Sequence, residues 1–368
     1  MTTVALFNVV YVFFAYLARY KGYEFFLKIS FFLIFLFLAL RYNYGNDYPQ
    51  YFYTFLDVKR HLGTDYSGEY LGKTMYFSFE SGWLFLYKLF QPLGFPWGFF
   101  ALVAVLAAFN CFVYYRFIKK YVSSRYYWFA VFLYVFDPNY MLLHSSAMRQ
   151  SLAISIFLFS LDYLYKKDII RYFLCAMLAS LIHTSAYVIF PIYLLGLFNW
   201  TSNKTLATSI FLLYISVFMS IQSIAPILTA LISSKLDRYE GYLKTASEVN
   251  SGLGIVYFSI MFALILFYER FQSKEASLLF KLALLAYFVK PLTLIISMIT
   301  RIEMYFNPIL IAVFPIVLMS IKNRFIKTIL LFVLMVWTLN SFYLFFQSDV
   351  WKKAFGTYQT IFSSPEIY

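Results

Sequence analysis

The sequence predicts an all-α polytopic integral membrane protein, with about 12 transmembrane helices and a short re-entrant or interfacial helix near residues 81–94. Composition is the first reason: 62% of the 368 residues are hydrophobic and only 13% are charged, with a mean hydropathy of +0.71. A soluble domain is roughly half apolar and about a quarter charged. A soluble all-helical fold of this composition could not bury its apolar surface.

Apolar runs of nearly membrane-spanning length are the second reason, because a helix needs about 20 mostly apolar residues to cross the bilayer core. The predicted spans cover residues 3–18, 25–40, 97–115, 126–143, 146–165, 171–184, 185–199, 205–225, 253–269, 277–299, 304–321 and 328–346. The 171–199 region is short and predicts a tight hairpin or broken helices. Segment 81–94 is too short and interrupted to span, so we expect a re-entrant or interfacial helix. Residues 1–368 form a single predicted membrane domain.

The distribution of Lys and Arg is the third reason, and it predicts the orientation. With the N-terminus outside, 17 of the 30 Lys and Arg lie at the cytoplasmic ends of spans, against five acidic residues. Short cytoplasmic loops are enriched in Lys and Arg in membrane proteins. The two long loops, 41–80 and 226–252, are then external. Loops of this length are more often functional than structural.

Several function classes are excluded by missing motifs. The two cysteines lie inside apolar runs without a CxxC pattern, and the three histidines are scattered, so we expect no metal site. The chain lacks a P-loop, a GxGxxG motif and an Asp-x-Asp pair, which argues against nucleotide-driven transport and dinucleotide chemistry. The net charge is +13, but the Lys and Arg residues that produce it lie mainly at the ends of the predicted helices, so no nucleic-acid partner is expected.

Basic residues near the external ends of spans are the first candidates for chemistry, because ionisable groups at membrane depth are expensive and usually functional. Arg149 and Arg301 carry planar donor forks suited to phosphate, and we expect them to bind a lipid pyrophosphate. Arg41 and Lys290 are further candidates for pyrophosphate binding. The alternatives are that these groups snorkel to the interface or pair with nearby acids, such as Arg301 with Glu303.

Two carboxylates and one histidine complete the candidate catalytic set. Asp47 and Glu80 are candidate general bases, with a solvated loop carboxylate as the alternative for each. His183 lies beside Thr184 at the apex of the 171–199 region, either as a catalytic or as a packing histidine. Aromatic residues make up 24% of the chain, and they either stack on sugar faces or fill the helix bundle.

All the candidate residues named above except Lys290 occur in five short motifs. In chain order, these are Arg41-x-x-x-Gly45-x-Asp47-Tyr48 followed by Tyr51 and Phe55; Phe79-Glu80-Ser81-Gly82-Trp83; Arg149-Gln150-x-x-Ala153; Ile182-His183-x-Ser185-Ala186 followed by Pro191; and Arg301-x-x-x-Tyr305-Phe306. Together the motifs resemble the EpsG family of exopolysaccharide assembly, which is related in role to Wzy-type polysaccharide polymerases. Ser81 departs from the proline expected after the family glutamate.

The resemblance implies a glycosyltransferase of the bacterial inner membrane. Such a polymerase moves a growing glycan from undecaprenyl pyrophosphate onto a lipid-linked repeat unit at the periplasmic or external face. The energy of the donor lies in its own pyrophosphate bond, so no cofactor is expected. Among the aromatic residues, Tyr48, Tyr51 and Tyr305 are the predicted sugar-binding residues. Membrane lipid surrounds the enzyme, and the expected partners are a flippase and a chain-length regulator.

Two other functions remain open. An O-antigen ligase moves glycan onto lipid A core, and such ligases usually carry one large external loop late in the chain, whereas loop 226–252 is modest. A flippase or transporter of lipid-linked oligosaccharide is the non-enzymatic alternative. It should show inverted repeats, and the sequence has no clear repeat.

Overall fold

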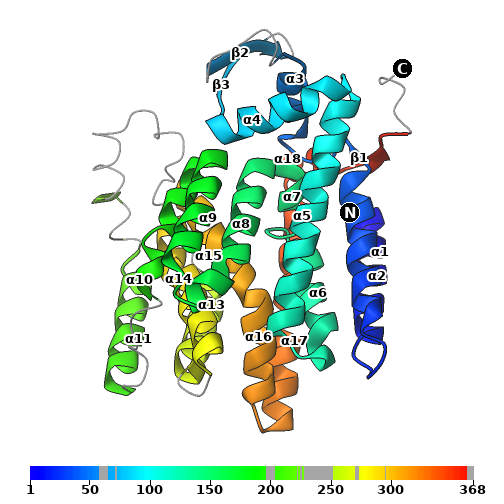
Figure 1. The fold of residues 1–368 in the computed structure, drawn as a ribbon. Coiled ribbons are helices and arrows are strands. Elements are labelled where there is room, and N and C mark those ends of the chain that lie inside the picture. Colours follow the sequence, from blue (N-terminus) through cyan, green and yellow to red (C-terminus); the bar gives the residue numbers. More distant parts are fainter. Residues whose placement is uncertain are drawn as a thin grey trace. The chain divides into compact units, whose positions relative to one another are not determined.

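The computed structural model describes residues 1–57, 65–70, 73–195, 204–221, 223, 226–227, 252–269, 273–294 and 296–362. The described residues are mostly helical, with two small two-stranded antiparallel sheets (Figure 1). They form two compact units. Unit 1 holds residues 1–163, 169–187 and 323–368, and unit 2 holds residues 164–168 and 188–322.

Unit 1 contains the N-terminal half of the chain and its C-terminal end. Its helices are α1 (Thr2–Leu17), α2 (Phe25–Ala39), α3 (Tyr48–Asp57), α4 (Ser81–Phe90), α5 (Trp97–Tyr121), α6 (Tyr127–Phe136), α7 (Leu143–Ser146), α8 (Met148–Tyr165), α9 (Ile169–Ile182), α17 (Arg324–Phe345) and α18 (Asp349–Ala354), with 3-10 turns η1 (Gln91–Leu93), η2 (Ser124–Tyr126) and η3 (Thr184–Ile189). Strand β1 (Arg41–Tyr42) pairs with β4 (Gln359–Thr360), and β2 (Asp65–Tyr70) pairs with β3 (Lys73–Ser78).

Helices α2 and α5 of unit 1 run antiparallel to each other. The ring of Phe31 in the middle of α2 contacts Tyr115 near the C-terminal end of α5, at 5.8 Å between centroids. Tyr42, just after α2, contacts Phe100 in the first turn of α5 at 6.2 Å. One end of unit 1 therefore gathers residues near 40–45 and 97–100, and the other end gathers residues near 19–28 and 115–125.

Unit 2 is a second group of helices. It comprises α10 (Ile192–Leu195), α11 (Lys204–Met219), α13 (Gly252–Glu269), α14 (Lys274–Thr293), α15 (Thr300–Phe306) and α16 (Leu310–Ser320), with 3-10 turns η6 (Ser297–Ile299) and η7 (Asn307–Ile309). Helix α14 packs on both α13 and α15. Tyr214 of α11 stacks on Phe262 of α13, with ring centroids 4.1 Å apart.

The all-α membrane class predicted from composition agrees with the helices. In the described part of the chain, four helical segments are long and apolar enough to cross a membrane: Trp97–Tyr121, Lys274–Thr293, Thr300–Ser320 and Arg324–Phe345. Six shorter apolar helical segments accompany them within the same residues. The number of about 12 spans stays a prediction.

Two predicted spans end earlier than their apolar runs suggest. The span predicted over 126–143 stops at Phe136, because Pro138 disfavours helical backbone at Asp137. The Asp137 carboxylate instead accepts the Asn139 backbone N–H at 2.9 Å, in a turn typical of aspartate. The span predicted over 277–299 stops at Thr293, shortly after Pro291. The 171–199 region is broken: α9 ends at Ile182, and short helical turns follow it as far as Leu195.

The two predicted external loops differ in how much of each the structure describes. The described residues of region 41–80 include helix α3 and strands β1, β2 and β3. Most of loop 226–252 lies outside the described residues. The short helix predicted near 81–94 is present as α4, whose 10 residues span roughly 15 Å. That length is about half the hydrocarbon core, so α4 cannot cross it.

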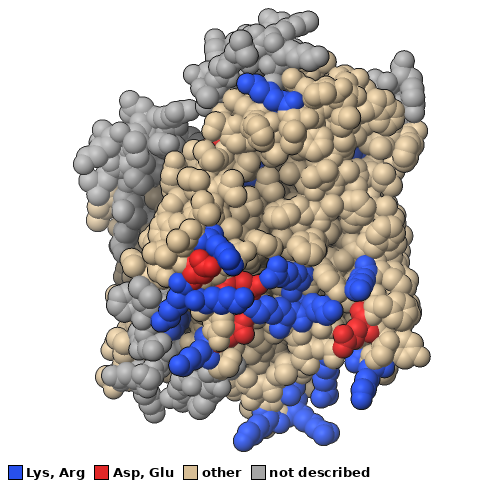
Figure 2. Space-filling view, in the orientation of Figure 1, with Lys and Arg blue, Asp and Glu red and all other residues tan. Residues whose placement is uncertain are grey.

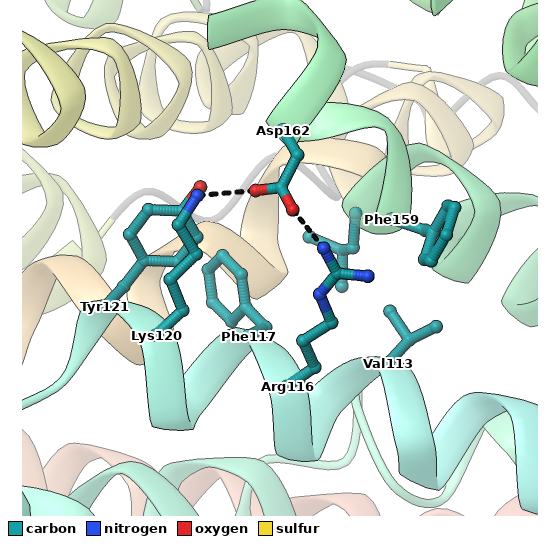
Figure 3. A pocket seen from close by; sticks show the side chains of 8 residues that line it. Val113, Arg116, Phe117, Lys120, Tyr121, Phe159 and Asp162 are labelled. Atoms are coloured by element: carbon teal, nitrogen blue, oxygen red, sulfur yellow. Dashed lines mark hydrogen bonds and ion pairs between the residues drawn. The ribbon is translucent and has the colours of Figure 1, made fainter. Parts of the chain in front are cut away.

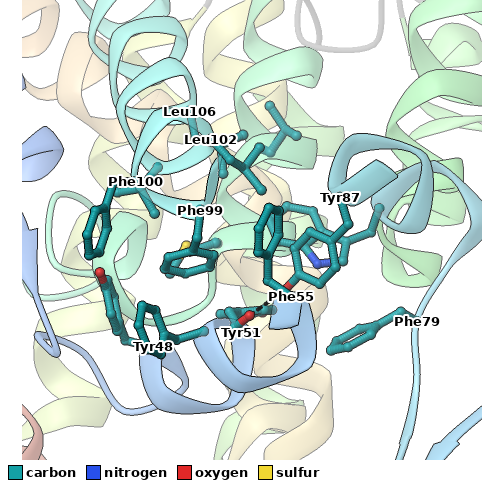
Figure 4. Close-up of a cluster of buried hydrophobic side chains, with 14 of the residues drawn as sticks. Tyr48, Tyr51, Phe55, Phe79, Tyr87, Phe99, Phe100, Leu102 and Leu106 are labelled. Atoms are coloured by element: carbon teal, nitrogen blue, oxygen red, sulfur yellow. Dashed lines mark hydrogen bonds between the residues drawn. The ribbon is translucent and has the colours of Figure 1, made fainter. Parts of the chain in front are cut away.

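An aromatic cluster joins α3, α4 and α5 at one end of unit 1 (Figure 4). Trp83 and Tyr87 lie one turn apart on α4, and both are fully buried. Tyr87 donates to the Tyr51 carbonyl at 2.9 Å. Gly82 lets α4 approach α9 closely, since a Cβ there would lie 2.6 Å from the Leu181 carbonyl oxygen. This packing sets the position of the residue that precedes α4, which is Glu80.

At its other end, unit 1 carries a basic cluster. On the face drawn in Figure 2, Lys and Arg side chains gather in the lower part, together with a few acidic ones. Asp162 of α8 pairs with both Arg116 and Lys120 of α5, and the Lys120 Nζ–Asp162 Oδ1 distance is 2.5 Å (Figure 3). These residues line a small hollow with Phe117 and Phe159.

Gly45 is a position where we expect substitution to be costly. Its φ is +129°, and an added Cβ would lie 2.3 Å from the Ser145 carbonyl oxygen. Left-handed backbone at an L-residue costs about 1–3 kcal/mol, and the overlap adds to it. We expect Gly45→Ala to lower the melting temperature in detergent clearly more than Gly22→Ala, a matched control with φ +87° and no atom within 4 Å. Equal shifts from both variants would contradict this packing.

Candidate functional site

Glu80 is the centre of the candidate site. It precedes α4 in an extended conformation, and its carboxylate meets groups from two other helical regions. One oxygen, Oε2, forms an ion pair with the Arg149 guanidinium. The other, Oε1, lies 3.1 Å from His183 Nδ1 and accepts the Thr184 backbone N–H at 2.9 Å. The predicted residues Glu80, Arg149 and His183 therefore lie together, although 69 and 103 residues separate Glu80 from the other two.

Arg149 lies in the first turn of α8 and is held on several sides. Besides the ion pair, its Nε donates to the Tyr51 hydroxyl at 3.5 Å. Its guanidinium carbon lies 4.6 Å from the centroid of the Phe79 ring, a cation–π distance. The side chain is 18% exposed. The guanidinium is thus fixed in place, and part of the Arg149 side chain remains exposed.

The Glu80 carboxyl is strongly acidic. Partial burial alone would raise its pKa, but the His183 hydrogen bond, the Arg149 charge and the Thr184 N–H together lower the pKa from 4.5 to about 2. Glu80 is therefore ionised at neutral pH. A carboxylate of such low pKa is a weak base, because an efficient general base has a pKa near the working pH.

Stability should depend on pH through Glu80. Because folding lowers this pKa, the ionised carboxylate stabilises the fold above pH 4.5, and that contribution is lost as pH falls toward 2. A shift of this size corresponds to at most roughly 3 kcal/mol, since solvent screening reduces the contribution of a partly exposed carboxylate. We expect the melting temperature of the wild type to exceed that of Glu80→Gln at neutral pH, and the difference to shrink on acidification. A difference that stays constant down to about pH 3 would contradict this prediction.

His183 has one ring nitrogen engaged and one available. Nδ1 faces Glu80, whereas Nε2 makes no hydrogen bond within the described part of the chain. The residue is 8% exposed and follows the last turn of α9. A histidine held by a carboxylate through one nitrogen can exchange a proton through the other, which is the arrangement of many general bases.

Asp47 lies near this cluster. It is half-buried just before α3, and Asn46 donates to its Oδ1 at 3.2 Å. Burial raises the pKa of the Tyr51 hydroxyl; the Arg149 charge opposes that rise, and the Asp47 charge adds to it. Both charges therefore lie within electrostatic reach of one hydroxyl. Asp47 stays a candidate base.

Arg41 is almost completely buried, at 2% exposure. Its guanidinium donates to the backbone carbonyls of Leu38 and His144, the latter at 3.0 Å. Burial lowers its pKa to about 10, so it remains a cation. This placement favours a structural role in tying the end of α2 to α7, and pyrophosphate binding by Arg41 stays a prediction.

The predicted sugar-binding tyrosines are also buried. Tyr48 is 1% exposed and Tyr51 is 3% exposed, both on the inner face of α3. Tyr305 of unit 2 is fully buried. A ring buried on both faces cannot stack on a sugar in this conformation, so sugar binding by these residues stays untested and would need their exposure.

The other predicted phosphate-binding residues belong to unit 2. Lys290 Nζ lies 2.9 Å from the Glu303 carboxylate, which also accepts from Asn307 at 3.1 Å. Glu303 thus forms an ion pair with Lys290. Arg301 lies in the same short helix as Glu303. The two units are described separately, and the roles of Lys290 and Arg301 stay predictions.

Sequence reasoning missed two contributors to the cluster. The Phe79 ring faces the Arg149 guanidinium, and the Thr184 N–H binds Glu80. Each is the direct chain neighbour of a predicted residue, and this adjacency is the sequence signal that could have identified it. Among the described residues, no group of three His, Cys, Asp or Glu side chains could hold a metal ion.

Comparison with known proteins identifies one family. The model of the EpsG family matches residues 24–360, nearly the whole chain. EpsG is a family of Wzy-like polysaccharide polymerases. No curated protein and no solved structure matches the chain.

Proposed function

The chain belongs to the EpsG family, and we propose that it transfers a growing glycan from undecaprenyl pyrophosphate onto a lipid-linked repeat unit. The product would be an exopolysaccharide or an O-antigen. We place the reaction at the periplasmic or external face of the bacterial inner membrane, with membrane lipid around the helices.

One observation carries the proposal: the Arg149–Glu80–His183 cluster lies at the opposite end of α8 from the Asp162–Arg116 pair. Thirteen residues of helix separate Arg149 from Asp162, roughly 20 Å at 1.5 Å per residue. Lys and Arg in short loops favour the cytoplasmic side. The basic end of unit 1 then faces the cytoplasm, and this orientation supports an external position for the cluster.

The leaving group sets the role of Arg149. When the bond between the anomeric carbon and the pyrophosphate oxygen breaks, the electron pair leaves on that oxygen, and negative charge grows there. A fixed guanidinium stabilises such charge, because its dipole and charge are already oriented. Arg149 is paired with Glu80 and backed by Phe79, so it would meet the phosphate without rearranging.

The acceptor sets the role of His183. A sugar hydroxyl of the repeat unit attacks the anomeric carbon, a C–O bond forms, and the hydroxyl proton must leave. We assign that proton to His183 Nε2, with Glu80 holding the ring through Nδ1. Glu80 thereby acts as a positioning group rather than as the base that the sequence suggested, since its low pKa makes it a weak base. Asp47 is the second candidate for the base.

The remaining residues extend this proposal. Arg301 and Lys290 would bind phosphate from unit 2, and Tyr48, Tyr51 and Tyr305 would contact sugar after a rearrangement that exposes them. The donor carries its own energy in the pyrophosphate bond, so the reaction needs no cofactor. A flippase and a chain-length regulator are proposed partners by family analogy.

A deletion strain separates this function from its alternatives. Loss of a polymerase leaves surface lipid with a single repeat unit and no ladder of longer chains. Loss of an O-antigen ligase leaves carrier-linked polymer and bare core, and loss of a flippase leaves no external repeat unit. We expect the first pattern, reversed by the wild-type gene, and either of the others would overturn the proposal.

A further inference from the structure

The last residues that the structure describes pack against the segment that leads into the candidate site. We call residues 354–361 the C-terminal clasp. Helix α17 brings the chain to the end of α6, where Phe342 contacts Phe136 at 5.4 Å between ring centroids. Helix α18 follows, and Trp351 stacks on Phe345 at 4.9 Å.

Backbone hydrogen bonds join the clasp to residues 37–45. The Gly45 N–H donates to the Ala354 carbonyl at 3.1 Å, and the Ile361 N–H donates to the Leu40 carbonyl at 3.0 Å. Between these two bonds, β4 pairs with β1, so that Arg41 lies opposite Thr360. A strand of two residues has little stability of its own, and side-chain contacts must support it.

Aromatic packing supplies that support. Tyr358 stacks on Phe37 with ring centroids 4.4 Å apart and an interplanar angle of 13°. Its hydroxyl donates to the Phe37 carbonyl at 2.7 Å. Tyr44 lies between the rings of Tyr358 and Phe355, at 5.3 and 5.0 Å. Tyr44 itself is fully buried.

The clasped segment, residues 37–45, connects to two structures that hold Arg149: helix α7, which precedes α8, and helix α3. On one side, Arg41 donates to the His144 carbonyl, and Gly45 lies against the Ser145 carbonyl, so α7 is held just before α8 begins. On the other side, the segment leads through Asp47 into α3, whose Tyr51 hydroxyl accepts from Arg149. Both routes from the clasp end at the same guanidinium.

We propose that the C-terminal clasp is a positioning element of the polymerase site, holding the 37–45 segment so that α7 and α3 fix Arg149. The inference rests on the proposed function for its activity readout. The extent of the family match agrees with it, because the match continues to residue 360, through β4. The clasp residues touch neither Arg149 nor Glu80 and act through the clasped segment.

Two changes to the chain test the clasp. A chain that ends after Phe355 lacks the strand pair and Tyr358, whereas a matched control that ends after Ser363 keeps every clasp contact. A point variant, Ile361→Pro, removes the one N–H that binds the Leu40 carbonyl. Tyr358→Phe keeps the stack and loses the hydroxyl, and Tyr358→Ala loses both.

Hydrogen exchange of the purified protein gives a readout that is independent of activity. We expect amides of residues 48–57 and 143–152 to exchange at least about tenfold faster in the Phe355-terminated chain and in Tyr358→Ala. Amides of α13 and α14 should exchange as in the wild type. Unchanged exchange at 48–57 and 143–152 would overturn the proposal.

Complementation of the deletion strain gives the second readout. We expect the Phe355-terminated chain and Tyr358→Ala to give no ladder at normal protein level, Tyr358→Phe to restore it in part, and the Ser363-terminated control to restore it fully. If the variants show faster amide exchange at residues 48–57 and 143–152 but still give a full ladder, the clasp stabilises the fold without supporting activity, and the proposal is overturned. If the wild-type gene fails to restore a ladder, the polymerase assignment fails instead, and the exchange data still decide the structural link.

Discussion

Arg149→Ala is expected to reduce chain growth by about 100-fold or more, the size of effect seen when one preorganised electrostatic donor is removed from an active site. The guanidinium is the described cation that lies against Glu80 beside His183, with 18% of its side chain exposed. Without it, the charge that grows on the leaving pyrophosphate has no oriented partner. The measurement is the ladder of the complemented deletion strain, quantified against protein level.

Two further variants make the Arg149 result interpretable. Removing one partner of a buried ion pair destabilises a protein by about 3–5 kcal/mol, so Arg149→Ala can lower protein level. Arg149→Lys keeps a cation beside Glu80 but loses the planar fork, and it should grow short chains only. Arg116→Ala is the matched control, since it breaks an exposed arginine–aspartate pair at the basic end, and it should give full ladders. Full ladders from Arg149→Ala would contradict the assignment.

His183→Asn is expected to lower chain growth by about 100-fold or more, the lower range for loss of a general base. Asparagine places an amide nitrogen near the position of Nδ1, so it can keep the hydrogen bond to Glu80 that the histidine makes at 3.1 Å. It has no group that can accept the acceptor proton at Nε2. Activity is measured with the purified protein on lipid-linked repeat units.

The comparison of two substitutions separates catalysis from support. If His183 is the base, His183→Asn and His183→Ala are equally inactive, while His183→Asn keeps the melting temperature of the wild type. If His183 only supports Glu80, His183→Asn keeps near wild-type activity. That second outcome would move the base to Asp47, and Asp47→Asn would then be the inactive variant.

Much of the candidate site could be predicted from the sequence, because charge is rare in this chain. A charged group beside an apolar run must find a partner or a function, and this reasoning selected Glu80, Arg149 and His183 one by one. It could not tell that they meet. Their contacts cross 69 and 103 residues, and only the packing of α4 on α9 and α5 brings them together.

Arg41 shows where such reasoning reaches its limit. A cation just after an apolar helix can bind a ligand, snorkel to the interface or cap a helix end. The structure places its guanidinium on the carbonyls of Leu38 and His144. The second carbonyl lies 103 residues away in the chain, so no local pattern separates these roles. The glycine four residues later gave a better signal, since its left-handed φ is required by the fold.

The fold was predictable in class and less so in detail. Apolar runs predict helices, but they do not mark where Asp137-Pro138 and Pro291 end them. The clasp had no sequence signal, because its strand β4 and the partner strand β1 have two residues each and pair across most of the length of the chain. Periodicity needs several residues to be visible, so a contact of this kind appears only in three dimensions.

A transfer assay with purified protein decides whether this chain is a polymerase. The protein in detergent or vesicles is supplied with one lipid-linked repeat unit, and the products are separated by length. The account predicts chains that grow by whole repeat units, with release of undecaprenyl pyrophosphate for each bond formed, from the wild type and Arg116→Ala but not from Arg149→Ala. Unchanged single repeat units with folded wild-type protein, or equal growth with Arg149→Ala, would contradict it.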